Sequence, residues 1–274
     1  MTNEPVGPGT DLPDFDADTA VTPLGEDRYG VTLLDRWNIV DGPNGGYLAA
    51  IMTRAMSETV AEPARALRSL TVHFLSRPRF AEAEVEVELL RKGRSLSTLQ
   101  ATLRQEGGIT CRALAAFSVP CPWTPKDEWR AAMPDTAHHE GVPMDDRPVP
   151  VASNWRGVPI ADAPFFSGDG SPRVGQWIRA ARPRALDAIE LVAIADAVPP
   201  AGFPAMTART AMPTIDLTVH IRAPLPRPAE EAEELVYAEF TTVHVADGFA
   251  EEDGTVWSAG GVLLAQSRQL AITN

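Results

Sequence analysis

The sequence repeats a pattern of motifs, and this internal duplication constrains the fold more than any other feature. The tetrapeptide Leu-Thr-Val-His stands at residues 70–73 and again at 217–220, an offset of 147. A pair of adjacent glycines stands at 107–108 and again at 260–261, an offset of 153. Both landmarks recur in the same order at nearly equal spacing, which predicts two similar structural units in tandem.

Each unit contains one strongly apolar helical segment ahead of the tetrapeptide. The first covers residues 47–56, after a glycine-rich breaker cluster at 42–46, and the second covers residues 185–197, before a Pro-Pro pair. The first helix is apolar on nearly every side, so it must be covered around its circumference. Both segments are therefore predicted to be buried helices.

Period-two patterns predict the strands that cover these helices. Between residues 82 and 89, glutamates alternate with apolar residues, as in a strand with one wet face. Residues 96–103 and 110–119 are predicted as two strands around a glycine turn, and residues 235–245 as a long strand of the second unit. We predict an α+β fold, the double hotdog, in which a long antiparallel sheet wraps each helix. The two sheets join edge to edge, which protects both edges.

Composition along the chain gives the domain boundaries. Residues 1–20 are acidic and proline-rich and are predicted to form a mobile tail. The N-terminal unit covers residues 21–120 and the C-terminal unit covers residues 173–274. Residues 121–172 lack a sustained period and are predicted to be an irregular connection with a short helix near 126–132.

Charge and composition exclude several functional classes. The chain has 274 residues, 24 of them basic and 37 acidic, for a net charge of −13. Basic surface supplies most of the attraction to nucleic acids and anionic membranes, so neither is an expected partner. Two cysteines are too few for a disulfide framework or a zinc site. With no secretory leader and no apolar run long enough to span a membrane, we expect a cytoplasmic protein.

The sequence lacks the common motifs for nucleotide binding, serine hydrolase catalysis and metal binding. There is no P-loop, no G-x-G-x-x-G for a dinucleotide and no G-x-S-x-G of serine hydrolases. The five histidines form no H-E-x-x-H motif. We expect neither a cofactor nor a metal ion.

Asp196 is the most informative single residue. It is predicted to lie in the last turn of an otherwise apolar helix, where the helix dipole disfavours a negative charge. One interpretation is an acid at a frayed helix end that reaches water or caps a loop. The other is a carboxylate in a largely apolar site, where burial shifts its pKa and it acts as a general base. Thr214 and Gln269 are unremarkable when each is considered alone.

Several segments together resemble the acyl-CoA thioesterase II (TesB-like) family. They are residues 214–224, 261–269 and 90–97, together with the glycine pair that begins the first helix. The resemblance implies a double hotdog thioesterase whose catalytic aspartate, threonine and glutamine correspond to Asp196, Thr214 and Gln269. The first unit has no such set, because Thr53 and Ala116 stand at the matching places.

The implied reaction is hydrolysis of an acyl-CoA thioester to a free acid and coenzyme A. Asp196 would take a proton from water, while Thr214 and Gln269 orient the water and the carboxylate. Backbone N–H groups at the start of the first helix are candidates for the oxyanion and substrate site, unless the segment is a plain tight turn. These donors belong to Gly45, Gly46 and Tyr47.

Coenzyme A is anionic, so an acidic protein needs a local basic patch to bind it. Arg91, Lys92 and Arg94 are the candidates, extended by Arg77 and Arg79, although such clusters are also common at solvated hairpin ends.

Two other functions are considered. An enoyl-CoA hydratase would need a histidine beside the acid, and none is near Asp196 in sequence. A non-catalytic acyl-thioester binding or assembly protein is the other alternative. A homodimer is a further expectation, since hotdog units associate through their sheets.

Overall fold

The computed structural model describes residues 12–120, 129–135, 142–143, 149–157 and 159–273. Two units of one design follow each other along the chain, and in each unit a strand precedes a helix and four main strands follow it. The N-terminal unit consists of β2 (Arg28–Thr32), α2 (Gly45–Val60), β3 (Ala66–Phe74), β4 (Glu82–Lys92), β5 (Leu96–Gln105) and β6 (Gly108–Ser118). The C-terminal unit consists of β10 (Arg173–Ala180), α3 (Ala188–Ile194), β11 (Thr214–Ile221), β12 (Val236–Thr241), β14 (Phe249–Trp257) and β15 (Leu263–Ile272).

Short elements complete the described chain. The helix is α1 (Phe15–Asp18), and the strands are β1 (Thr22–Gly25), β7 (Val142–Pro143), β8 (Trp155–Arg156), β9 (Pro159–Ala161) and β13 (Val245–Ala246). Single turns of 3-10 helix lie at Asp35–Trp37, Pro150–Asn154, Phe203–Ala205 and Ala229–Glu231.

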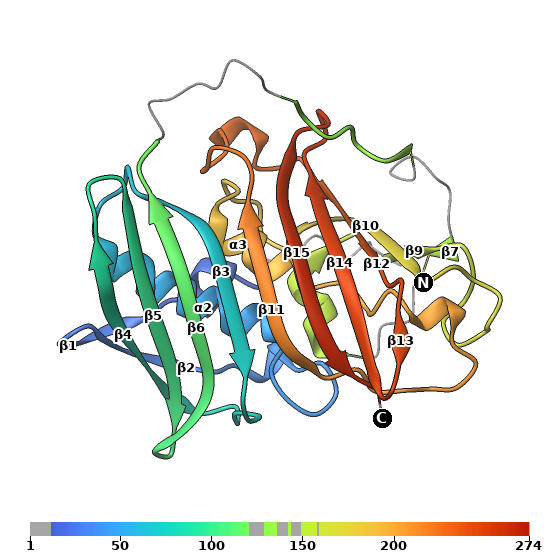
Figure 1. Ribbon diagram of the computed structural model, residues 1–274, viewed down its shortest axis with the longest axis horizontal. Coiled ribbons are helices and arrows are strands. Elements are labelled where there is room, and N and C mark those ends of the chain that lie inside the picture. Colours follow the sequence, from blue (N-terminus) through green and yellow to red (C-terminus); the bar gives the residue numbers. More distant parts are fainter. Residues whose placement is uncertain (1–11, 121–128, 136–141, 144–148, 158, 274) are drawn as a thin grey trace, which may run out of the picture.

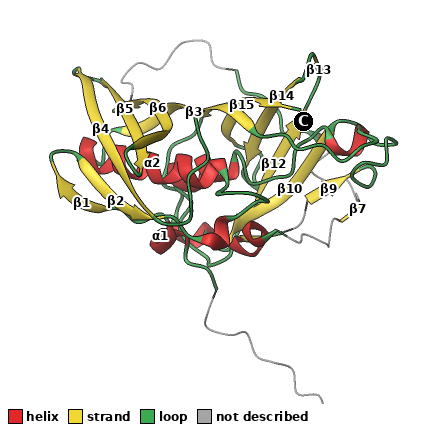
Figure 2. Ribbon diagram, turned by 90° about the horizontal axis from the view of Figure 1, so that it is seen from below, coloured by secondary structure: helices red, strands yellow, loops and turns green. Residues whose placement is uncertain are grey.

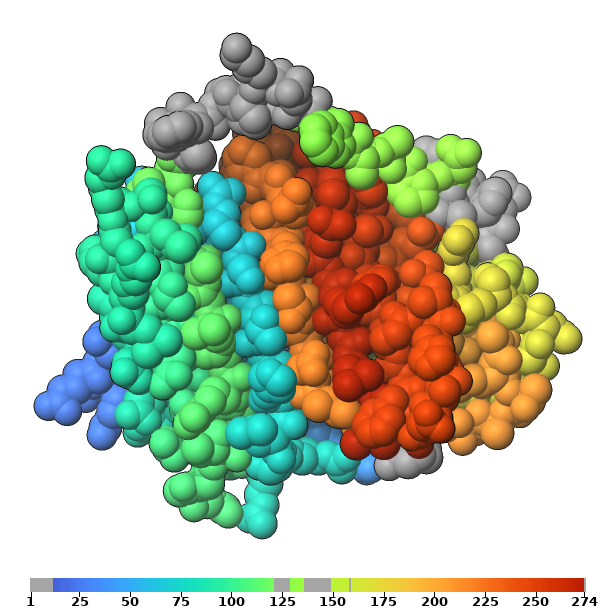
Figure 3. Space-filling view, in the orientation of Figure 1, coloured from blue at the N-terminus to red at the C-terminus, as the bar shows by residue number. Residues whose placement is uncertain are grey.

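The described strands form one continuous antiparallel sheet, as predicted. Its order is β1-β2-β4-β5-β6-β3-β11-β15-β14-β12-β10-β9-β7, so the two units share a single sheet (Figure 1). The sheet curves over α2, which lies against its concave face (Figure 2). Figure 3 shows the other face of the sheet, away from α2, where the side chains of neighbouring strands lie side by side.

The repeated tetrapeptides meet at the seam between the units. β3 pairs with β11 in antiparallel register, with Thr71 opposite Thr218 and Val72 opposite Leu217. The two threonine hydroxyls lie 3.0 Å apart. The duplicated sequence therefore forms a local two-fold arrangement, and the predicted edge-to-edge junction is confirmed.

Helix α2 begins at a strong cap and is enclosed along most of its length. The Asn44 side chain accepts a hydrogen bond from the Tyr47 N–H at 3.0 Å, which satisfies one of the free amides of the first turn. Tyr47, Ile51 and Met52 are fully buried. Helix α2 has 16 residues. Among the described residues, no helix combines the length and apolarity that a membrane crossing requires.

Helix α3 is shorter than its apolar sequence predicts. The expected helix covers residues 185–197, but α3 begins after Asp187, whose side chain accepts the Glu190 N–H at 2.8 Å. It ends at Ile194, where the chain tightens and the Asp196 N–H donates to the Ala193 carbonyl at 3.2 Å. Asp196 therefore lies just beyond the helix and not in its last turn.

The last residues of the predicted tail pack against both units. Residues 1–20 are predicted to be mobile, whereas the described part, from residue 12, has fixed contacts. Phe15 is 2% exposed, and its ring lies 6.0 Å from that of Trp37. Asp16 pairs with Arg184 of the C-terminal unit at 2.9 Å. Asp14 and Asp16, two of the acidic residues that suggested a solvated tail, pair with Arg182 and Arg184 far along the chain.

We expect Phe15→Ala to lower the free energy of unfolding by about 2 kcal/mol, the value of burying one large apolar side chain. The loss is limited because the segment can detach while the two units stay folded. Urea unfolding measures the change, and Leu12→Ala is the control because Leu12 is 51% exposed. Equal stability of the two variants would contradict the docking of this segment.

Residues 149–157 and 159–172, the described C-terminal part of the predicted connection, pack against both units. Trp155 is 5% exposed and contacts Trp37 of the N-terminal unit at 5.7 Å between ring centroids. β8 and β9 add to the edge of the sheet by pairing with β10. The short helix expected near 126–132 is absent at residues 129–132, and its first three positions lie outside the described residues.

Candidate active site

Asp196 lies where the end of α3 meets the beginning of α2. The Gly46 N–H donates to Asp196 Oδ2 at 2.8 Å. The Asn44 Nδ2 donates to the same oxygen at 3.0 Å and to the Asp196 backbone carbonyl at 2.7 Å. A carboxylate is disfavoured at the end of α3, but the free N–H groups and the positive end of the α2 dipole stabilise it. The N-terminal unit therefore holds the acid of the C-terminal unit.

The glycine pair allows this close approach. A Cβ on Gly45 would lie 2.9 Å from Asp196 Oδ2 and 2.9 Å from the Phe74 ring. A Cβ on Gly46 would lie 2.5 Å from the Ala193 carbonyl oxygen, a backbone atom that cannot swing aside. The close packing of α2 against the end of α3 thus explains why a pair of glycines begins α2.

Burial raises the pKa of Asp196 from its usual 3.8 to about 6. Hydrogen bonds from the Gly46 and Gly45 amides and from Asn44 oppose the rise, because they stabilise the ionised form. A carboxylate offers roughly four lone-pair positions, and these three donors leave one able to accept a proton. At neutral pH Asp196 is mostly ionised and has the basicity that a general base needs.

Thr214 and Gln269 are brought together by the sheet. Thr214 begins β11, Gln269 lies in β15, and the Thr214 hydroxyl donates to Gln269 Oε1 at 2.9 Å. The cross-strand register places Gln269 between Leu217 of β11 and Glu252 of β14. The hydroxyl and the amide that the resemblance selects, 55 residues apart, are therefore direct partners.

Glu252 is a fourth polar residue at this site, and no motif in the sequence indicated it. Gln269 Nε2 donates to Glu252 Oε1 at 2.6 Å, and the Ala201 N–H donates to Oε2 at 2.6 Å. Glu252 is 4% exposed. Burial, with the negative charges of Asp196 and Glu251, raises its pKa to about 7. The acidic stretch at 251–253 gave no signal because such residues usually face solvent.

The predicted oxyanion donors are engaged within the protein. The Gly46 amide hydrogen is given to Asp196 and the Tyr47 amide hydrogen to Asn44. The Gly45 amide also stabilises the Asp196 carboxylate. In this structure the amides of Gly45 and Gly46 hold the acid and that of Tyr47 holds Asn44, so they are not free to receive an oxyanion.

The predicted coenzyme A cluster lies far from Asp196 within the chain. Lys92 Nζ is 4.0 Å from Glu62, and the Arg94 carbonyl accepts from Arg65. Both contacts lie just past the C-terminal end of α2, whereas Asp196 contacts its N-terminal end. Sixteen residues of helix separate the two places by about 24 Å. Arg77 is nearer, since it packs beside Gly42 and pairs with Asp41 just ahead of α2.

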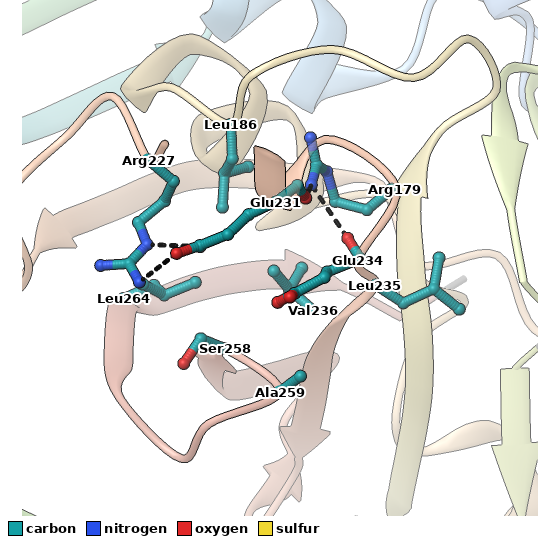
Figure 4. A pocket seen from close by; sticks show the side chains of 10 residues that line it. All are labelled: Arg179, Leu186, Arg227, Glu231, Glu234, Leu235, Val236, Ser258, Ala259 and Leu264. Carbon is teal, nitrogen blue, oxygen red and sulfur yellow. Dashed lines mark hydrogen bonds and ion pairs between the residues drawn. The ribbon is translucent and has the colours of Figure 1, made fainter. Parts of the chain in front are cut away.

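Two hollows lie away from these residues. The first is lined by Arg179, Arg227, Glu231 and their neighbours, and its volume of about 10 Å³ suits a single water (Figure 4). The second, of about 400 Å³, lies over Thr218, Gln266 and Arg268 on the outer face of the sheet. Within the described ranges, no three or more His, Cys, Asp and Glu side chains are grouped to hold a metal ion.

Known structures share this architecture. A conserved hot dog fold protein from Alicyclobacillus acidocaldarius is 24% identical, with a TM-score of 0.78, over 95% of this chain and 97% of that one. A protein of Thermobifida fusca YX, provisionally assigned as a thioesterase II, is 27% identical, with a TM-score of 0.76 and the same coverage of 95% and 97%. The acyl-CoA thioesterase II TesB2 of Mycobacterium marinum is 20% identical, with a TM-score of 0.73, over 95% and 98%.

Two buried helices under one shared sheet, with a carboxylate held where the helices meet, fit a double hotdog protein of the thioester hydrolase class. Residues 33–118 match the model of the acyl-CoA thioesterase N-terminal domain, and residues 127–273 match that of the C-terminal domain. The chain belongs to the acyl-CoA thioesterase family. Curated protein sequences gave no match.

Proposed function

We propose that this thioesterase hydrolyses acyl-CoA with Asp196 as the general base. The Asp196 carboxylate takes a proton from water, and the water oxygen forms a bond to the thioester carbonyl carbon. The carbon–sulfur bond then breaks, and the leaving sulfur of coenzyme A receives the proton from Asp196. The observation that carries this proposal is a partly buried carboxylate with a pKa raised to about 6, held between the ends of two helices.

Thr214 and Gln269 are proposed to orient the attacking water. Their mutual hydrogen bond of 2.9 Å fixes the hydroxyl and the amide relative to each other. A thioester carbonyl is electrophilic, so a positioned water with a base suffices for attack, and such base catalysis is typically worth about 10²–10⁴ in rate. The matching positions of the first unit cannot substitute, because the Thr53 hydroxyl is buried and donates to the Ala49 carbonyl of its own helix.

The hydratase alternative lacks its histidine in the described structure. His73 and His220 are exposed on the sheet, and His244 is exposed beside β13. None of these three contacts Asp196, whose observed donors are Asn44 and the amides of the glycine pair. The contacts of Asp196 therefore favour water activation over addition to a double bond.

Release of coenzyme A from acyl-CoAs of short to long chain length tests the proposed function. Turnover of at least one chain length supports it, and the profile of kcat/KM identifies the preferred acyl group. Tight binding of every thioester without release would overturn it and favour the non-catalytic binding alternative. Absence of both binding and release would also overturn the choice of coenzyme A as the carrier.

We expect Arg77→Ala to raise KM for acyl-CoA about fivefold at low ionic strength, as the loss of one exposed charge contact of roughly 1 kcal/mol implies. Arg77 lies near the Asp196 end of α2, and its side chain is 60% exposed. The control replaces Arg91, Lys92 and Arg94 together by alanine and should leave KM within twofold. A larger KM increase in the control would restore the original basic cluster as the coenzyme A site.

A further inference from the structure

Glu252 is a buried acid that the proposed reaction does not use. Its two carboxylate oxygens accept hydrogen bonds of 2.6 Å from Gln269 Nε2 and 2.6 Å from the Ala201 N–H. Among the described residues, no basic side chain forms an ion pair with it, and the charges that act on it, Asp196 and Glu251, are both negative. An unpaired buried acid of this kind is costly, so its place beside Gln269 calls for an explanation.

The chemistry of the two hydrogen bonds of Gln269 supplies that explanation. An ionised carboxylate accepts hydrogen bonds but cannot donate them, so only the NH₂ of Gln269 can face Glu252. The carbonyl oxygen of Gln269 must then face Thr214. That oxygen can only accept, so the Thr214 hydroxyl must donate its hydrogen to it, as the 2.9 Å contact shows. The charge on Glu252 thus determines the direction of both hydrogen bonds that Gln269 forms, the one with Glu252 and the one with Thr214.

We propose that Glu252 is a positioning residue for thioester hydrolysis, which fixes the Gln269 amide so that the Thr214 oxygen is presented to the attacking water as an acceptor. This inference rests on the proposed function, since it concerns the water that Asp196 activates. Asp196 takes one hydrogen of that water, and Thr214 receives the other in a hydrogen bond. Glu252 acts only through Gln269 and touches neither the water nor the thioester.

Protonation of Glu252 reverses this arrangement. A neutral carboxylic acid can donate to the carbonyl of Gln269, which lets the amide turn over and present its NH₂ to Thr214. Thr214 would then direct its own hydrogen towards the water and orient it wrongly. The pKa of about 7 brings this change into the working range. Asp196, from the end of α3, and Glu251, on the same strand, both favour protonation of Glu252 through their negative charge.

The decisive variant is Glu252→Gln, which keeps the size of the side chain and removes its charge. Glutamine can donate or accept, so it no longer forces one orientation of Gln269. We expect kcat to fall about tenfold with KM unchanged, because the water is misplaced while the substrate still binds. In the acid limb of the kcat/KM profile, the ionisation near 7 should disappear and the one near 6 should remain. A structural role alone would not alter this profile.

Glu239→Gln is the matched control. Glu239 is also a buried glutamate, 8% exposed, on the neighbouring strand β12, where it accepts from the Tyr237 hydroxyl at 3.0 Å. Its replacement should leave both kcat and the pH profile unchanged. If Glu252→Gln behaves like this control, with full kcat and an unchanged profile in an active wild type, the positioning role is wrong and Glu252 only ties the loop at Ala201 to the sheet.

A second measurement does not depend on activity. Carbon-13 NMR of the glutamate carboxyl groups in the wild-type protein should show one group that titrates near pH 7, and this signal should be missing in a folded Glu252→Gln protein and present in Glu239→Gln. A carboxyl group that stays protonated through pH 8.5 would overturn the proposal, because it could not fix the amide. A wild type inactive on every thioester would instead overturn the proposed function, whatever the titration shows.

Discussion

Asp196→Asn is expected to lower kcat for acyl-CoA hydrolysis by about 10²–10⁴-fold, the usual contribution of a general base. Asparagine keeps an oxygen that can accept from the Gly46 amide and from Asn44, so the junction of α2 and α3 should be preserved. The variant loses only the lone pair that takes a proton from water. Steady-state release of coenzyme A measures the change, and KM should remain within a few-fold of the wild-type value.

The fold of Asp196→Asn should be at least as stable as that of the wild type above pH 6. Burial raises the pKa of Asp196 to about 6, so the folded state holds its proton more tightly than the unfolded chain does. The ionised acid therefore lowers stability as pH rises from about 4 to 6, and asparagine avoids this loss. Thermal unfolding at pH 8 provides the check. Full activity in a folded Asp196→Asn protein would show that another group activates the water.

The same ionisation predicts the pH dependence of the wild-type enzyme. A general base works when deprotonated, so kcat/KM should fall as pH falls through about 6. Glu252, with a pKa of about 7, titrates in an overlapping range, and the negative charge of Asp196 helps to raise its pKa. The acid limb should therefore be broader than one ionisation, and its apparent pKa values belong to the pair. A rate independent of pH between 5 and 8 would contradict both assignments.

Gly46→Ala is expected to have the second large effect, on stability and on activity together. The added methyl would lie 2.5 Å from the Ala193 carbonyl oxygen and 3.1 Å from Asp196 Cβ, so α2 must move away from α3. Overpacking against backbone costs about 3 kcal/mol, which corresponds to roughly 6–10 °C in Tm. A shift of about 1 Å in the catalytic acid costs roughly 10²-fold in kcat.

Gly108→Ala is the matched control for this substitution. Gly108 is the first residue of β6, and its added Cβ would meet only the Gln105 carbonyl oxygen at 3.6 Å, an ordinary contact. We expect it to change Tm by no more than a degree or two. Calorimetry and steady-state kinetics on both variants decide the matter. Unchanged Tm and kcat in Gly46→Ala would mean that the helix junction is looser than the structure shows.

Much of the fold could be predicted from local patterns. Alternating glutamates at 82–88 predicted a strand with one wet face, and β4 buries Ala83, Val85 and Val87 between them. The repeated tetrapeptides predicted two units and their shared sheet. Such patterns succeed because burial repeats with the period of the backbone. The packed segment at Phe15 was not predictable in this way, since its acidic residues pair with arginines of the other unit.

The candidate site was predictable only in part. The resemblance selected Asp196, Thr214 and Gln269, and the structure joins two of them directly. It could not select Glu252, because the acidic stretch at 251–253 has the composition of an exposed strand. Whether an acid in a strand faces water or the core depends on the register with β15, which residues distant in sequence determine.

The two buried helices, the antiparallel strands around them and the duplication could be predicted without a structure, because they follow from the spacing of apolar residues and repeated motifs along the chain. The surroundings of Asp196 could not, because they are formed by contacts between distant segments of the folded protein. Local sequence places this acid at the unfavourable end of α3, and the beginning of α2, 150 residues away, supplies the N–H group that holds it. The direction of the hydrogen bonds from Thr214 to Glu252 depends on burial and charge in three dimensions, and no local pattern of residues records either.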